Sequence, residues 1–285
     1  MGSEDDYTDW VPAYFNLAVP TQGATPVLVE VPHAGLDVPD GVRHQLCATQ
    51  VDLERDADIY VDQLCADAAE TGATLLTARA SRYVVDLNRA ADDVDRETVS
   101  DRRGAKANQA RGVVWRMTTT GVPSLTRPLT EREFANRLAE YYTPYHDTLG
   151  RELARLRERF GFATLVAAHS MPSVGRGARG EHRVRRADIV PGTRGRTTAD
   201  ARFIEMVDAH FRAAGLTVRH DDPYRGGYTT GHYGRPESGV HAVQIEINRA
   251  LYVDETTRQP REGNFERLQR LMTELFDKLG RLDLR

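Results

Sequence analysis

The chain has 285 residues, of which 40% are hydrophobic and 28% are charged, and its formal net charge is −4. This composition is typical of a soluble globular protein and excludes a disordered or fibrous chain. No apolar stretch approaches the roughly 18 residues of a membrane span, and the acidic N-terminus differs from a secretory signal, so we expect a cytoplasmic protein. Cys47 and Cys65 lack the spacing of a disulfide framework or of a thiolate zinc site. The length suits one large domain spanning residues 1–285.

The first part of the chain alternates between strand-like and helix-like patterns. An aliphatic run at 27–31 predicts a buried strand, and apolar residues at helical spacing predict a helix over 51–69. Two short strands are expected at 74–78 and 83–87. The polar segment 90–112 contains few large apolar residues and is expected to be irregular.

A long amphipathic stretch occupies the middle of the chain, where Thr130 and Glu133 form a capping-box start. Pro144 should kink this helix or divide it into two. Further along, strands are expected at 164–168, 187–190, 216–219 and 243–249, helices at 198–214 and 264–279, and a glycine-rich loop at 222–239. Strands and helices that alternate in this way predict an α/β fold with a mixed, mainly parallel sheet flanked by helices.

Several predicted strands end in polar residues suited to chemistry. His33 follows the aliphatic run Val-Leu-Val-Glu-Val, His169 follows Thr-Leu-Val-Ala-Ala, and Glu246 lies in the run Val-Gln-Ile-Glu-Ile-Asn-Arg. Open α/β sheets bind ligands at the carboxyl ends of their strands. A buried carboxylate costs several kcal/mol of desolvation unless it is paired or functional. The pattern indicates a metal-assisted hydrolase.

The two histidines need a third ligand to make a catalytic zinc site with one open position. The acidic cluster at the start of the predicted helix supplies four candidates, Glu54, Asp56, Asp58 and Asp62. Asp58 and Asp62 would share one helical face, but acids near a helix N-terminus are also favoured by the helix dipole alone. Spacing does not choose among the four.

Asn88 and Arg89 follow another predicted strand, at 83–87. A guanidinium and a neighbouring amide can bind a carboxylate, with the guanidinium as a bidentate fork. An equally good interpretation of this motif is an ion pair between Arg89 and Asp92 or Asp93. Both interpretations stay open on the motif alone.

The segment 176–196 is rich in arginine and glycine. It is expected to be a solvated loop over the site, or alternatively a positive funnel for anionic substrates. Its arginines are Arg176, Arg179, Arg183, Arg185, Arg186, Arg194 and Arg196.

Taken in order, these motifs resemble the N-formylglutamate amidohydrolase (deformylase) family. The resemblance runs from about residue 27 to 255, and its most specific blocks contain Asp-Leu-Asn-Arg-Ala and Gln-Ile-Glu-Ile-Asn-Arg-Ala-Leu-Tyr. The matching stretches are VPHAG at 31–35, DIYVDQL at 58–64, YVVDLNRAADDVD at 83–95, RPLT at 127–130, AHSMP at 168–172, DPYRGGY at 222–228 and YGRPESGVHAVQIEINRALYVDE at 233–255.

The resemblance implies a zinc carboxypeptidase-like fold of the phosphorylase/hydrolase type and one Zn²⁺ ion per chain. It implies His33, Asp58 and His169 as zinc ligands, Glu246 as general base, and Asn88 with Arg89 as the clamp for the substrate carboxylate. Arg225 is the candidate for stabilising the oxyanion or for binding a second carboxylate. The implied reaction converts N-formyl-L-glutamate to formate and L-glutamate.

Three alternatives remain. The nearest is a zinc hydrolase of another N-acyl amino acid or a small peptide, because the clamp recognises a carboxylate and not the acyl group. A serine hydrolase is disfavoured because no G-x-S-x-G elbow is present, and Glu237-Ser238-Gly239 lacks the first glycine. An anion- or nucleic-acid-binding module based on 176–196 is disfavoured by the net charge and by the lack of interleaved aromatic residues. We therefore expect a small-molecule substrate and no nucleic-acid partner.

Overall fold

The structure is a computed structural model, and it describes residues 14–100, 110–176 and 183–285. Arg179 of the arginine-rich segment lies outside the described residues, as do the N-terminal residues of the predicted domain. The extent of that domain over 1–285 therefore stays a prediction.

A six-stranded sheet occupies the centre, in the order β1-β3-β2-β4-β8-β7. The four middle strands run parallel to one another, and the two edge strands β1 and β7 are antiparallel to their neighbours. The prediction of a mixed, mainly parallel sheet is confirmed. The strands are β1 (Phe15–Ala18), β2 (Val27–Val31), β3 (Thr74–Ala78), β4 (Ala163–Met171), β7 (Ile189–Gly192) and β8 (Val240–Asn248).

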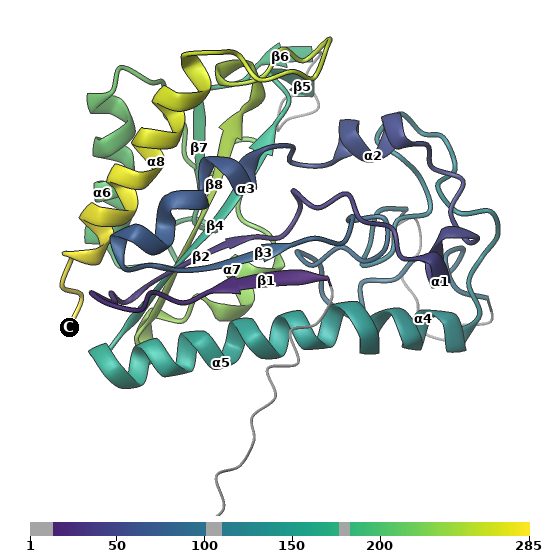
Figure 1. The fold of residues 1–285 in the computed structure, drawn as a ribbon, viewed down its shortest axis with the longest axis horizontal. Helices are drawn as coiled ribbons and strands as arrows, with labels where there is room; N and C mark the ends of the chain where they lie inside the picture. The colour runs from purple at the N-terminus through teal and green to yellow at the C-terminus, as the bar shows by residue number, and fades with distance from the viewer. Residues whose placement is uncertain (1–13, 101–109, 177–182) are drawn as a thin grey trace, which may run out of the picture.

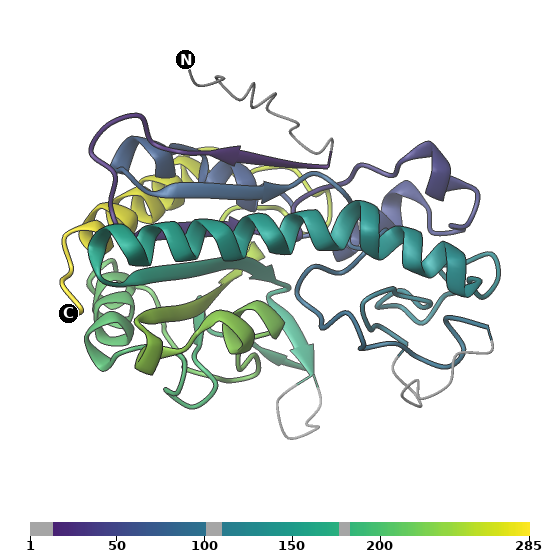
Figure 2. The same ribbon diagram turned by 90° about the horizontal axis from the view of Figure 1, so that it is seen from below.

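Helices cover both faces of the sheet (Figures 1 and 2). On one face lie α5 (Thr143–Phe160) and α7 (Tyr228–Tyr233), and on the other α3 (Val61–Leu64), α6 (Ala201–Ala213) and α8 (Asn264–Gly280). Strand β2 shows the reason for two cores, because its side chains alternate between the faces. Val27, Val29 and Val31 join the core under α6 and α8, whereas Leu28 joins the core under α5.

The remaining elements are short. They are α1 (Asp40–Arg43), α2 (Gln50–Asp56), α4 (Glu131–Arg137), the hairpin strands β5 (Val174–Arg176) and β6 (Arg183–Arg185), and the 3-10 turns η1 (Ala66–Thr71), η3 (Pro236–Ser238) and η4 (Arg249–Leu251). The hairpin β5–β6 occupies part of the segment that was expected to be a plain loop.

The long amphipathic stretch is helical without a break over 131–160, so the prediction that Pro144 divides it into two helices is wrong. Helix α4 begins with the expected capping box of Thr130 and Glu133. A π-helical turn over Leu138–Tyr142 joins α4 to α5, and Pro144 lies in the first turn of α5. The N–H of Thr143 bonds to the carbonyl of Leu138, five residues earlier, so the wider π-helical turn lies directly before Pro144.

The predicted helix over 51–69 is wrong as a continuous element. Helix α2 ends at Asp56, the chain then leaves helical geometry, and α3 begins only at Val61. Tyr60 has a φ of 65°, and the backbone N–H of Asp58 donates to the carbonyl of His33 at 2.9 Å. Asp58 therefore lies in the break between two helices, and its predicted shared helical face with Asp62 does not exist.

The predicted strand 83–87 is also wrong, because this segment forms buried turns. The N–H of Val84 bonds back to Ser81, and the N–H of Asp86 bonds to the carbonyl of Val113. Its aliphatic residues were read as a strand, but they pack into the core beside α4 and α5 without pairing in the sheet. Residues 216–219 contribute only one β-bridge, between Val218 and Ile189, and the glycine-rich loop contains α7. Strand β1 was not predicted.

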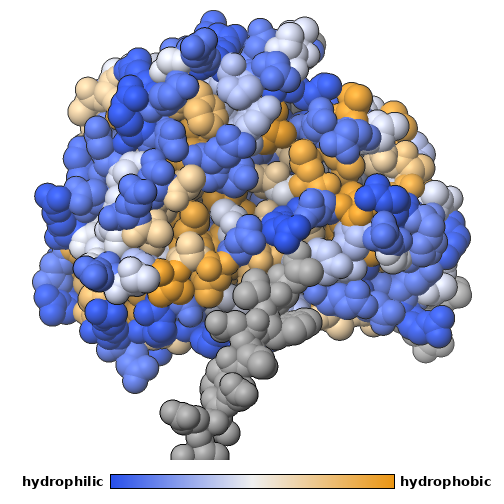
Figure 3. Space-filling model, viewed as in Figure 1, coloured by the Kyte–Doolittle hydropathy of each residue, from blue (hydrophilic) through white to orange (hydrophobic). Residues whose placement is uncertain are grey.

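Among the described residues, no helix is long and apolar enough to cross a membrane. On the face seen in Figure 1, hydrophobic residues gather towards the middle and hydrophilic residues surround them (Figure 3).

Candidate active site

A pocket of about 1590 Å³ opens at the carboxyl ends of the parallel strands β2, β4 and β8. Its lining includes all seven residues that the sequence nominated, namely His33, Asp58, Asn88, Arg89, His169, Arg225 and Glu246. It also includes many cations, among them Arg82, Arg111, Arg183, Arg186, Arg194 and Arg249. Parallel strands place their carboxyl ends at one edge of the sheet, so residues far apart in sequence meet there.

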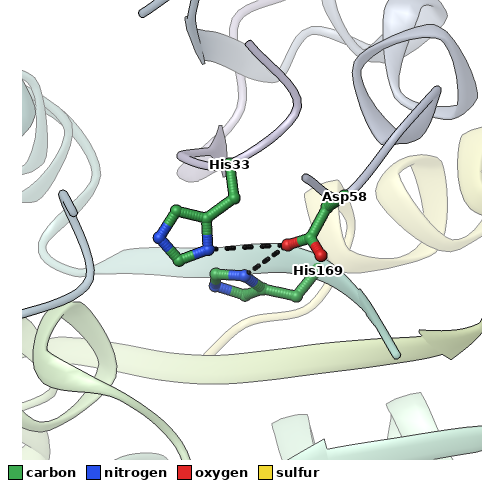
Figure 4. A group of neighbouring side chains, drawn as sticks. All are labelled: His33, Asp58 and His169. Carbon is green, nitrogen blue, oxygen red and sulfur yellow. Dashed lines mark hydrogen bonds and ion pairs between the residues drawn. The ribbon is translucent and has the colours of Figure 1, made fainter. Parts of the chain in front are cut away.

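Three of these residues form a compact group of metal-ligand type (Figure 4). The Nδ1 atoms of His33 and His169 lie 3.5 Å and 3.0 Å from the same carboxylate oxygen, Oδ2 of Asp58. One ligand atom from each residue lies within 4.8 Å of the others, and each residue is at most 3% exposed. Two imidazoles and a carboxylate oxygen, converging from separate elements, match the donor set of a catalytic zinc site.

The fold separates the four acids that spacing did not distinguish. Glu54 pairs with Arg258 at 3.0 Å, and it is not part of the metal-ligand group. Asp56 accepts hydrogen bonds from the Tyr83 hydroxyl at 2.5 Å and from the backbone N–H of Thr119. Its carboxylate therefore links the end of α2 to the segments that contain Tyr83 and Thr119. Asp62 lies on α3, beyond the break. Asp58 is the member of the cluster that the structure places against both histidines.

Asp58 is held by both of its oxygens. While Oδ2 faces the two imidazoles, Oδ1 accepts hydrogen bonds from the Ser170 hydroxyl at 3.2 Å and from Nη2 of Arg249 at 3.3 Å. Arg249 also donates to the carbonyls of Arg55 and Ala57, so it ties down the non-helical segment that carries Asp58. Burial opposes ionisation of Asp58, but hydrogen bonds from His169 and His33 hold its pKa well below its usual range. The carboxylate is therefore ionised and fixed in orientation.

Asp86 supports the other side of the group. Its Oδ1 lies 2.8 Å from Nε2 of His33, and its Oδ2 accepts from Arg82 at 2.8 Å and from the Trp115 indole at 2.9 Å. A carboxylate on the second nitrogen of a metal-binding histidine fixes the ring and leaves the first nitrogen available for a metal. Burial raises the pKa of Asp86, but Arg82 and His33 outweigh it and hold that pKa well below its ordinary value.

Glu246 lies beside this group on the neighbouring strand, because β4 and β8 pair with His169 opposite Glu246. Glu246 is only 6% exposed, and burial raises its pKa to about 7. His169 opposes that rise and the negative charge of Asp58 adds to it. A carboxyl group with a pKa near neutrality can both accept and return a proton, as general acid-base catalysis requires.

The three nominated substrate-binding residues line the same pocket. Asn88 accepts from the N–H of Thr229 at 3.0 Å, and its amide nitrogen lies 3.2 Å from Nε2 of His169. Arg89 lies 3.5 Å from Asp93, so the ion pair that the sequence left open is present, and its side chain remains 39% exposed. Arg225 is exposed at the pocket wall. The structure thus places these residues together, and their roles stay predictions.

Sequence reasoning assigned no role to Asp86, Gln244 and Arg249, although all three contact nominated residues. A signal existed for Gln244, because residues two apart on a strand share one face and Gln244 precedes Glu246 by two. No comparable signal existed for Arg249, since its contacts with the segment 55–58 span more than 190 positions of sequence.

The geometry of the pocket agrees with the protein family to which the sequence is similar. A sequence model described as N-formylglutamate amidohydrolase matches residues 25–253. The chain belongs to this family. It is 34% identical over 242 residues to N-formylglutamate deformylase of Pseudomonas putida and 35% identical over 250 residues to that of Pseudomonas aeruginosa, covering 82% of this chain and 84% of each relative.

Solved structures agree with this membership. The crystal structure of N-formylglutamate amidohydrolase from Ralstonia eutropha JMP134 superposes with a TM-score of 0.86 at 31% identity, covering 94% of this chain and 97% of that one. The gene product Atu2144 from Agrobacterium tumefaciens shares the fold, with a TM-score of 0.64 at 23% identity and coverage of 93% and 96%. The chain is therefore an amidohydrolase, as its motifs predicted.

Proposed function

We propose that this amidohydrolase uses one zinc ion to hydrolyse N-formyl-L-glutamate to formate and L-glutamate. The observation that carries the proposal is the meeting, in one pocket, of the His33, Asp58 and His169 group with the buried carboxyl of Glu246. Two relatives that are about one-third identical bear the name N-formylglutamate deformylase, which supports this substrate.

The residues present fit zinc. The ion would be held by Nδ1 of His33, Nδ1 of His169 and Oδ2 of Asp58. Asp86 orients His33 through its other ring nitrogen, and Arg249 orients Asp58 through its other oxygen. When bound, the ion supplies a Lewis acid that activates a water molecule and polarises the formyl carbonyl. Three protein ligands leave a position open for this chemistry.

Glu246 performs the proton transfers of the reaction. Its carboxylate accepts a proton from the attacking water while the water oxygen forms a bond to the formyl carbon. The carbon–nitrogen bond then breaks, and the proton passes from Glu246 to the departing nitrogen, which leaves as the amine of glutamate. A rise of the Glu246 pKa to about 7 by burial suits both halves of this exchange.

The arginine-lined wall supplies the substrate recognition. N-formyl-L-glutamate carries two carboxylates, and Arg89 with Asn88 would bind the α-carboxylate while Arg225 binds the second one. Bidentate guanidinium contacts fix orientation as well as affinity, so the formyl carbon would be presented to the water that Glu246 activates.

The direct test is formate release by the purified zinc-loaded protein from N-formyl-L-glutamate, compared with N-acetyl-L-glutamate and with other N-formyl amino acids. We expect the highest kcat/KM for N-formyl-L-glutamate. A clear preference for the N-acetyl compound, or for an N-formyl amino acid without a second carboxylate, would instead select the nearest alternative, a hydrolase of another N-acyl amino acid.

The role of Arg89 has its own test. Arg89→Lys keeps the charge but loses the bidentate geometry, so kcat/KM for N-formyl-L-glutamate should fall by about 10- to 100-fold. The α-amide of the substrate lacks the carboxylate that Arg89 would bind. The native enzyme should hydrolyse this amide poorly, and the Arg89→Lys substitution should reduce that rate little further.

Equal hydrolysis of the acid and the amide by the native enzyme would leave Arg89 with a structural role. Its contact with Asp93 at 3.5 Å is the partner that such a role would have.

A further inference from the structure

Gln244 contacts the proposed general base, Glu246, directly. It lies on β8 two residues before Glu246, so both side chains project from the same face of the strand. Gln244 is 3% exposed, and its Nε2 donates to Oε1 of Glu246 at 2.8 Å. Among the contacts of the described residues, this is the hydrogen bond that the Glu246 carboxyl group receives.

The other end of the amide is also engaged. Oε1 of Gln244 accepts from the backbone N–H of Gly227 at 2.8 Å and from the side-chain amide of Asn88 at 3.2 Å. A backbone N–H can only donate, so the amide oxygen must face Gly227 and the amide NH₂ must face Glu246. The orientation of Gln244 is therefore set by the chain itself.

Gly227 also lies close against Asn88. A Cβ atom at position 227 would overlap the side-chain amide of Asn88, so a larger residue there would displace an amide that itself contacts Gln244. The N–H of Thr229, one residue beyond Tyr228, fixes the other end of Asn88. The start of α7, Asn88, Gln244 and Glu246 thus form one connected hydrogen-bond network.

We propose that Gln244 is a positioning residue that holds the Glu246 carboxylate in its reactive orientation and links it to the segment 225–229, which includes the proposed substrate-binding Arg225. The inference rests on the proposed function of Glu246 as the base. With Oε1 of Glu246 held by the amide, the carboxylate cannot rotate freely, and its second oxygen is kept for the water. A base held in one orientation contributes more to the rate than one that samples several.

Two variants separate this role from simple packing of the loop. Gln244→Glu keeps an oxygen that accepts hydrogen bonds from Gly227 and Asn88. It replaces the NH₂ group that donates to Glu246 with a second carboxylate oxygen, and the two carboxylates repel each other. Gln244→Met has similar length and neither donates nor accepts at these positions. Loss of a hydrogen bond to a charged group predicts a kcat lower by about 10- to 100-fold in both variants.

The expected signature is a loss in kcat with little change in KM for Gln244→Glu, with bound zinc per chain equal to that of the native protein. Gln244→Met should lose kcat as well and should also raise KM, because the loop contact is gone. The matched control is Gln22→Glu, an exposed glutamine before β2 at the opposite ends of the parallel strands, which should behave like the native protein.

Near-native kcat in Gln244→Glu would overturn the proposal, because a residue that only packs the loop tolerates this change. A crystal structure of Gln244→Met should show Glu246 in a different or mixed orientation, and an unchanged Glu246 would equally contradict it. If the native protein does not hydrolyse N-formyl-L-glutamate at all, the proposed function fails, and the crystal structure still tests the positioning of Glu246.

Discussion

Replacing His33 or His169 with alanine is expected to abolish metal retention and hydrolysis together while the fold persists. Each imidazole supplies one of the three atoms that converge within 4.8 Å, and a site with two ligands holds zinc poorly. We expect zinc affinity to fall by more than about 100-fold, since loss of supporting residues alone can cost that much. The measurements are zinc per chain after dialysis and a circular dichroism melt of each variant.

The acidic cluster supplies a matched pair of variants for the same site. Asp58→Ala should lose zinc as the histidine variants do, because Oδ2 of Asp58 faces both Nδ1 atoms. Asp62→Ala, one short helix further on, should retain zinc and activity. Full zinc occupancy in the Asp58 variant, or in either histidine variant, would remove that residue from the ligand set.

Replacing Glu246 with glutamine is expected to leave zinc content and KM close to native values and to lower kcat by about 10²- to 10⁴-fold. The amide preserves the size of the side chain but cannot accept a proton from water, so only the chemical step suffers. Steady-state kinetics with formate detection, together with zinc analysis, measure the effect. Turnover near the native rate would show that another group accepts the proton.

The pH dependence gives the same residue a second test. Glu246 must be ionised to act as a base, so kcat should rise with pH and be lost as pH falls through the pKa of this group. Burial raises that pKa to about 7, and the positive charge of a bound zinc ion lowers it, so the acidic limb should have its midpoint at or below about pH 7. The residual activity of Glu246→Gln should lack this limb. An unchanged limb in the variant would assign the titration to a different residue.

Much of the secondary structure that carries the site could be predicted from local sequence patterns. The aliphatic runs of β2 and β4 and the alternation in β8 predicted three strands, because these patterns depend on which face each side chain meets. His33 follows β2 by two residues, whereas His169 and Glu246 lie within β4 and β8, near their carboxyl ends. The capping box of Thr130 and Glu133 predicted where the long helical stretch begins, because it acts through neighbouring backbone groups. Family motifs added the choice of Asp58 and the amidohydrolase activity.

Tertiary structure decided what local patterns could not. The helical spacing across Asp58 is real, but the hydrogen bond from its N–H to His33 and the guanidinium of Arg249 draw this residue out of the helix and towards the histidines. Asp56 has the same chemistry as Asp58, yet Tyr83 and Thr119 engage it elsewhere. Sequence spacing relates only residues that are neighbours along the chain. A buried carboxylate is costly unless it is paired or hydrogen-bonded, so its partners determine its role. In this protein those partners come from distant segments of the chain.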